Sequence, residues 1–196
     1  AGTSVLACST TRNLSAPSKV TVKLYGYDDV QISWSKVGYA VGYKVYYKRS
    51  TSKSYSYIGF TTGRSIKKAN LSDGVKYTFK VVPCTKVNGS YFADDSSKTA
   101  SITTLKAVST PKVEKYASSK VKISWTDIAG ESGYQISKST KKNKIGNVVT
   151  VKGSNAKSKL IKVAKGKKYY YKVRAYKTVN GKKIFGPWSA AKKFKR

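Results

Sequence analysis

The chain has 196 residues, of which 39% are hydrophobic and 12% aromatic, so it can form a packed core and is too apolar for an intrinsically disordered chain. It contains no His, which excludes Ser-His and Cys-His nucleophile pairs and His-based zinc sites. Its 40 Lys and Arg against 8 Asp and Glu give a net charge of +32, which attracts anionic partners but does not choose among nucleic acid, sulfated glycan, lipid headgroups and wall polymers.

The positive charge is spread along the whole chain. Residues 1–106 carry 16 basic and 5 acidic residues, a net charge of +11, and residues 107–196 carry 24 and 3, a net charge of +21. This scatter favours a generally solvated basic surface over one dedicated docking patch, although both interpretations stay open. No apolar run approaches the roughly 18 residues that cross a bilayer, so we expect no membrane insertion.

The second half of the chain repeats the first with a shift of 91 to 92 positions. In chain order, the matched segments are VQISW ending at Trp34 with VKISW ending at Trp125, GYKVY from Gly42 with GYQIS from Gly133, LSDGVKYTFKV from Leu71 with VAKGKKYYYKV from Val163, and Asn88-Gly89 with Asn180-Gly181. A repeat of this length indicates two copies of one structural unit.

Each copy has the texture of β-strands. Apolar and polar residues alternate over short runs rich in Val, Ile, Tyr and Thr, as in residues 121–125, and no segment sustains a helical period. The Asn-Gly pairs tolerate positive φ and predict a hairpin between the last two strands of each copy. The pattern therefore predicts an all-β fold.

These segments resemble the fibronectin type III family, an immunoglobulin-like β-sandwich of about seven strands. The second copy's GKKYYYKVRAYKTVNGKKIFGPWS is similar to Lys-rich repeats of surface proteins and secreted hydrolases of Gram-positive bacteria. The resemblance implies that Trp34 and Trp125 pack in the two cores, and that Tyr77 and Tyr169 each form a tyrosine corner, in which the hydroxyl bonds to nearby backbone.

The repeat and the resemblance together predict the domain organisation. We expect an N-terminal extension over residues 1–15, a first fibronectin type III-like domain over 16–105, a linker over 106–110 and a second such domain over 111–196. The short linker is expected to keep the two domains in contact or semi-rigidly aligned.

Nothing in the sequence suggests catalysis, and we expect no catalytic residue, metal site or cofactor. Asp28 and Asp29 are adjacent in a predicted turn, as are Asp94 and Asp95, and neighbours in an extended chain face opposite ways. They are interpreted as hydrated turn residues.

Most aromatic residues fall at core positions of the repeat. Tyr39, Tyr91 and Phe92 do not, and in a sandwich of this topology their loops emerge at the same end, so they are candidate ligand contacts. Tyr55 and Tyr57 also remain, alternating onto one face of a strand. Packing between domains or along strand edges is the alternative interpretation of all of these residues.

The two cysteines, Cys8 and Cys84, match no metal-binding pattern. Cys84 falls near the end of the sixth strand, beside the start of the first strand, and the residues between Cys8 and Pro17 are long enough to bring the two together. We therefore predict a Cys8–Cys84 disulfide, which fits an oxidising extracellular location. The alternative is that Cys84 is a small buried hydrophobic residue.

These inferences predict a non-catalytic extracellular or cell-surface module, a spacer or adhesive element whose basic surface contacts anionic wall polymers or glycans. The alternative is a recognition module for a specific sulfated glycan, nucleic acid or host protein. A protein partner fits either function, and nucleic-acid binding is expected to be nonspecific only.

Overall fold

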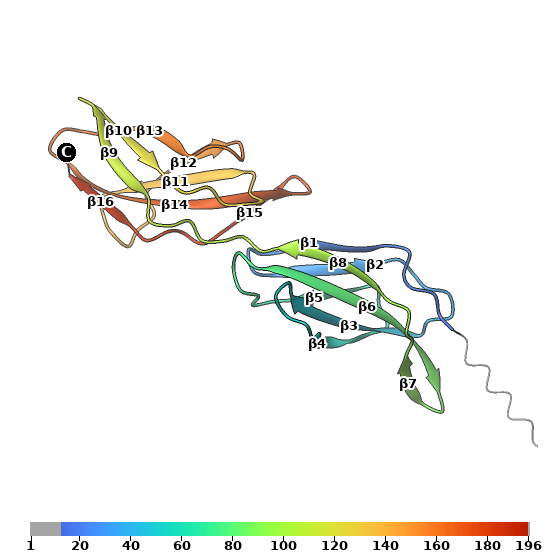
Figure 1. The fold of residues 1–196 in the computed structure, drawn as a ribbon. Helices are drawn as coiled ribbons and strands as arrows, with labels where there is room; N and C mark the ends of the chain where they lie inside the picture. The colour runs from blue at the N-terminus through green and yellow to red at the C-terminus, as the bar shows by residue number, and fades with distance from the viewer. Residues whose placement is uncertain (1–12, 196) are drawn as a thin grey trace, which may run out of the picture.

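The computed structural model describes residues 13–195, and these residues form strands, turns and loops without a helix (Figure 1). The first eight strands, which we call the first sandwich, are β1 (Val20–Leu24), β2 (Val30–Trp34), β3 (Gly42–Arg49), β4 (Ser56–Thr61), β5 (Ser65–Lys68), β6 (Lys76–Val87), β7 (Ser90–Ala93) and β8 (Lys98–Thr103). The second sandwich comprises β9 (Lys112–Ala117), β10 (Lys120–Ser124), β11 (Gly133–Ser139), β12 (Asn147–Lys152), β13 (Ser158–Lys162), β14 (Lys168–Val179), β15 (Lys182–Phe185) and β16 (Lys192–Lys195). Within the described part of the chain, no helix is long and apolar enough to span a membrane.

Each sandwich pairs a three-stranded antiparallel sheet with a five-stranded one. The strand orders are β1-β2-β5 and β4-β3-β6-β7 in the first sandwich, with β8 also paired to β6, and β9-β10-β13 and β12-β11-β14-β15 in the second, with β16 also paired to β14. The expected all-β fold with two sandwiches is confirmed. The last strand of each copy is interrupted, into β7 and β8 or β15 and β16, which gives eight segments where about seven were expected.

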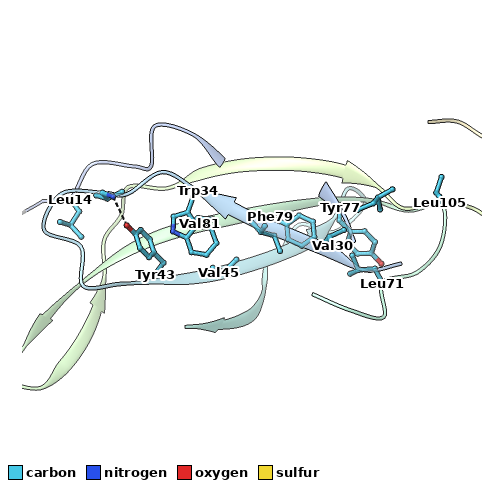
Figure 2. Packing of buried hydrophobic residues seen from close by; sticks show 13 residues of the cluster. Leu14, Val30, Trp34, Tyr43, Val45, Leu71, Tyr77, Phe79, Val81 and Leu105 are labelled. Atoms are coloured by element: carbon cyan, nitrogen blue, oxygen red, sulfur yellow. Dashed lines mark hydrogen bonds between the residues drawn. The ribbon is translucent and has the colours of Figure 1, made fainter. Parts of the chain in front are cut away.

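The alternating pattern of the strands produces the core of the first sandwich. Val30, Ile32 and Trp34 of β2 point inward and are buried, while the residues between them are partly exposed. The indole of Trp34 meets the ring of Tyr43 edge-on with centroids 5.3 Å apart, and the Tyr43 hydroxyl accepts a hydrogen bond of 2.9 Å from the backbone N–H of Val37 (Figure 2). These contacts fix Trp34 of β2, the ring of Tyr43 and the loop that contains Val37 relative to one another.

The second sandwich repeats this arrangement. The ring centroids of Trp125 and Tyr134 are 5.2 Å apart, and the Tyr134 hydroxyl accepts a hydrogen bond of 2.8 Å from the N–H of Ile128. The same hydroxyl donates a hydrogen bond of 2.7 Å to the carboxylate of Asp127. The repeat seen in the sequence is therefore a repeat of core packing.

Two-residue turns close the long hairpins β6–β7 and β14–β15. Asn88 and Gly89 have φ of 47° and 82°, and Asn180 and Gly181 have φ of 51° and 75°. Two successive residues with positive φ match the right-handed twist of the flanking strands, and Asn-Gly adopts this conformation at little cost. The β6–β7 hairpin projects beyond the body of the first sandwich, away from the second (Figure 1).

The two sandwiches lie end to end and share contacts (Figure 1). In the connecting segment Leu105 is buried, and its N–H donates a hydrogen bond of 3.1 Å to the carbonyl of Tyr27. Val179 and Ile184 of the second sandwich pack against the core of the first. The ammonium group of Lys23 also donates a hydrogen bond of 3.2 Å to the side-chain oxygen of Asn180, so the β14–β15 hairpin rests on the first sandwich.

Candidate functional site

The four predicted core residues are not equivalent. Trp34, Trp125 and Tyr77 are buried, and the Tyr77 hydroxyl accepts a hydrogen bond of 3.0 Å from the N–H of Ser72, as expected of a tyrosine corner. Tyr169 is half-buried at the edge of its core, and its hydroxyl makes no hydrogen bond within residues 13–195. The Tyr169 ring packs beside Tyr171 at 6.3 Å between centroids, as the Tyr77 ring packs beside Phe79 at 6.5 Å, but the described residues show no tyrosine-corner hydrogen bond at Tyr169.

We call the face of each five-stranded sheet that points away from the core its outer face. Cys84 lies on the outer face of the first sandwich and is fully buried there by neighbouring side chains. Its cross-strand neighbour is Gly42, and the ring of Phe60 fills the space where a side chain on Gly42 would lie. Burial raises the pKa of the Cys84 thiol. Cys8 lies outside the described residues, and Cys84 forms no disulfide within them, so the Cys8–Cys84 bond stays a prediction. Counting alkylated thiols by intact mass in the unreduced, unfolded protein tests it.

The three candidate aromatic contacts divide into two groups. Tyr39 and Phe92 line one hollow of about 380 Å³ at the outer end of the first sandwich, together with Lys86, Asp94 and Asp95. Tyr91 does not line this hollow, and its ring packs against Phe60 with centroids 4.4 Å apart. Successive strand residues point to opposite faces, which separates Tyr91 from its neighbour Phe92.

A second group of aromatic residues lies on the outer face of the first sandwich. We call Tyr46, Lys48, Tyr55, Tyr57 and Lys80 the Tyr–Lys cluster. The ammonium of Lys80 lies 5.1 Å from the ring centroid of Tyr46 and 4.6 Å from that of Tyr55. The ammonium of Lys48 lies 4.9 Å from the Tyr55 ring, so two ammonium groups share one ring.

Strand register assembles this cluster from three segments of the chain. Tyr46 of β3 pairs with Lys80 of β6 on one side and with Tyr57 of β4 on the other. The register between β3 and β4 shifts by one residue next to Tyr46, a β-bulge that keeps Ile58 and Gly59 turned inward while Tyr57 faces out. The rings of Tyr46 and Tyr57 then meet with centroids 5.4 Å apart.

The second sandwich has a different stack on its outer face. The guanidinium of Arg174 lies 4.0 Å from the ring centroid of Phe185 and 4.4 Å from that of Trp188. It also donates two hydrogen bonds, of 3.0 and 2.7 Å, to the side-chain carbonyl of Gln135, and burial lowers its pKa. The guanidinium is engaged within the protein by two rings and two hydrogen bonds, so this stack is not an open binding site.

Several of the acidic residues hold backbone amides in turns. Asp29 accepts a hydrogen bond of 3.1 Å from the N–H of Asn70, and Asp73 accepts one of 3.1 Å from Ala107. Asp94 accepts two hydrogen bonds of 2.8 Å, from the N–H groups of Ser96 and Leu14, and these bonds lower its pKa. Such acids act as structural acceptors. Among the described residues, Lys112 pairs with Glu114 at 2.7 Å and Lys157 with Asp127 at 4.0 Å, and the strand Lys residues other than Lys112 form no salt bridge with an acidic residue.

Glu131 differs from these acidic residues. It is buried in the loop between β10 and β11, and one of its carboxylate oxygens has no hydrogen-bond partner in the described structure. Burial raises its pKa, and the nearby charge of Asp127 adds to this effect. No group of three or more metal-ligating side chains occurs among residues 13–195.

No family model matches the chain, and no curated protein matches it. Among solved structures, the chain is similar to the FN1–FN3 domains of chicken CNTN1, at 20% identity over 93% of this chain and 68% of that one, with a TM-score of 0.43. It is also similar to a segment of two fibronectin type III domains from chicken tenascin, at 19% identity over 92% of this chain and 99% of that one, with a TM-score of 0.41.

Proposed function

We propose that the chain is a non-catalytic, extracellular spacer whose basic surface contacts anionic polymers of a bacterial cell wall. The observation that carries this proposal is the distribution of charge. Lys residues lie on exposed strand faces of both sandwiches, while Asp29, Asp73 and Asp94 bond to backbone amides in turns. A surface with an excess of positive charge attracts a polyanion through many weak contacts and needs no dedicated pocket.

The end-to-end arrangement supports the spacer part of the proposal. Contacts between Val179, Ile184 and the first core, and the buried Leu105, limit bending at the joint. The two sandwiches lie end to end in an elongated arrangement, which suits a spacer (Figure 1). The bacterial setting rests on the resemblance of residues 166–189 to Lys-rich surface repeats.

Co-sedimentation with isolated Gram-positive cell walls tests the proposal. We expect retention at low salt and release as salt rises, because exposed charge contacts are screened over about 8 to 10 Å near physiological ionic strength. Walls stripped of their phosphate polymers serve as the control and should retain much less protein. Equal retention on stripped walls, or none on intact walls at low salt, would remove wall contact from the proposal and leave a plain spacer.

A recognition module is the second candidate function, and the hollow beside Tyr39 and Phe92 favours it. This hollow combines exposed rings with both signs of charge, from Lys86 and from Asp94 and Asp95. Such a site predicts saturable binding of one ligand that persists at high salt. Phe92→Ala should abolish that binding, whereas salt-dependent wall retention should be unchanged in the same variant.

A further inference from the structure

Several Lys ammonium groups lie over aromatic rings, such as Lys67 over Tyr25 at 3.8 Å, but in the Tyr–Lys cluster two of them share one ring. Surface Lys side chains are ordinarily mobile, and contacts with them cost conformational entropy. Here the ammonium groups of Lys48 and Lys80 both lie against the ring of Tyr55, at 4.9 and 4.6 Å from its centroid, and Lys80 is also 5.1 Å from Tyr46. Cation–π contacts of this kind contribute about 0.5 to 1 kcal/mol each at exposed sites.

The cluster also has unused hydrogen-bonding capacity. Within residues 13–195, neither ammonium group donates a hydrogen bond to a protein atom, and the hydroxyls of Tyr46, Tyr55 and Tyr57 have no partner. No Asp or Glu occurs in the sequence between Asp29 and Asp73, nor in strand β6. Two ammonium groups therefore share the ring of Tyr55, beside unpaired hydroxyls and without a counter-charge from their own strands.

We propose that the Tyr–Lys cluster is a docking site for phosphate groups of a polyol-phosphate wall polymer, an inference that rests on the proposed function and assigns its principal contact. Two ammonium groups and flanking hydroxyls present several donors, which suits a phosphate with its several acceptor oxygens. A phosphate at this site supplies the counter-charge that these strands lack.

The ring geometry favours a polyol chain over a nucleic acid or a sugar polymer. Bases bind single-stranded sites mainly by stacking on free aromatic faces. In this cluster the faces of Tyr46 and Tyr55 already carry an ammonium group, and Tyr46 and Tyr57 are tilted by 54° relative to each other. The cluster therefore offers its charge to the phosphate groups, and the rings of Tyr46 and Tyr55 are not free stacking platforms for bases.

The equivalent surface of the second sandwich lacks the rings. Lys172 pairs with Ser137 as Lys80 pairs with Tyr46. On the repeat alignment, Gly146 and Val148 stand where the first sandwich has Tyr55 and Tyr57. The second sandwich thus supplies control Lys residues, such as Lys172, at positions that lack counterparts of Tyr46, Tyr55 and Tyr57.

The test measures binding of the full chain to polyol-phosphate polymer purified from cell walls, at low salt. Lys48→Gln with Lys80→Gln should weaken binding about tenfold, and the charge-matched control, Lys172→Gln with Lys193→Gln, about twofold. Tyr55→Leu leaves the net charge unchanged and should still weaken binding about fivefold, because the two ammonium groups lose their common support. Thermal melting of each variant establishes that it is folded.

The outcomes separate the two proposals. If the wild-type chain does not bind the polymer at low salt, the proposed wall contact fails. If the wild type binds but Tyr55→Leu and the Lys48/Lys80 variant behave like the control pair, only the Tyr–Lys site is overturned. Stronger binding of a sulfated glycan or a single-stranded oligonucleotide, with the same loss in Tyr55→Leu, would overturn the assignment to a polyol phosphate.

Discussion

The two sandwiches fill the same space on their outer faces with rings from different strands. In the first, Phe60 of β4 covers Gly42, and the small Cys84 lies opposite that glycine. In the second, Tyr176 takes the position of Cys84 and packs over Gly133, and the small Thr150 takes the position of Phe60. Around the equivalent glycines Gly42 and Gly133, the large and the small residue have exchanged strands. The space beside the glycine is therefore filled in both sandwiches, although by different side chains.

The same comparison explains where the surfaces diverge. Core positions repeat because each must fill a fixed volume, as Trp34 and Tyr43 match Trp125 and Tyr134. Outer positions are free of that constraint, and there the first sandwich has its Tyr–Lys cluster and the second its Arg174 stack. Functional differences between the copies are therefore expected on the outer faces and not in the cores.

Replacing the core tryptophans should give the largest effects, and equal ones. Trp34→Ala and Trp125→Ala each leave a large cavity and should destabilise their sandwich by about 3 to 5 kcal/mol. Hydrogen exchange of the full chain, resolved by sandwich, measures each loss separately. Unchanged exchange in the second sandwich of Trp125→Ala would contradict the core equivalence.

Replacing the two equivalent glycines, Gly42 and Gly133, by Ala should reduce stability by different amounts. Gly133 has φ of +152°, and an added Cβ would meet the backbone carbonyl of Val151 and the Tyr176 ring, so Gly133→Ala should cost about 2 to 4 kcal/mol. Gly42→Ala meets only the ring of Phe60, which can move, and should cost about 1 kcal/mol. Urea unfolding of the two variants ranks them, and the reverse order would refute the proposed exchange of rings.

The two tyrosines at the corner position should respond differently to loss of the hydroxyl. Tyr77→Phe leaves the N–H of Ser72 without its acceptor and should destabilise the first sandwich by about 1 to 2 kcal/mol. The Tyr169 hydroxyl has no such partner in the described residues, so Tyr169→Phe should change stability by less than about 0.5 kcal/mol. Equal losses in both variants, measured by thermal unfolding, would show that the corner is present twice.

Much of the fold was predictable from the sequence, because alternation and Asn-Gly turns act locally. The strands around Trp34 and Trp125 and both long hairpins follow from these signals alone. The interruption of the last strand was not predictable, since it depends on tertiary bonds such as the one of 2.9 Å from the N–H of Val173 to the Ser189 hydroxyl.

The candidate site was only partly predictable. Tyr55 and Tyr57 stood out as aromatic residues without a core role, but their proximity to Lys80 depends on pairing between β3 and β6 and on the bulge beside Tyr46. Grouping Tyr91 with Tyr39 and Phe92 overlooked the alternation of side chains within β7. Contacts between strands far apart in sequence carry the information that residue types alone lack.

A further small effect concerns the pH dependence of stability at the start of the first sandwich. Hydrogen bonds from Ser96 and Leu14 lower the pKa of Asp94, so its contribution to stability is present above the ordinary aspartate pKa of about 3.9 and is lost as pH falls through the lower folded value. Asp94→Asn should therefore be less stable than wild type by about 0.5 to 1 kcal/mol at pH 7. This difference should shrink below about pH 3 as the wild-type carboxyl is protonated. A difference that stays constant from pH 7 to pH 2, followed by thermal melting, would contradict this role.

The salt dependence of polymer binding by the wild-type chain tests the central claim most directly. If uncompensated Lys residues make the contact, the logarithm of the affinity for polyol-phosphate polymer should fall linearly with the logarithm of the salt concentration, with a slope of several units. The Lys48/Lys80 variant should show a slope shallower by about one to two units. An affinity that does not change with salt would contradict an electrostatic contact and would favour a specific pocket such as the hollow beside Phe92.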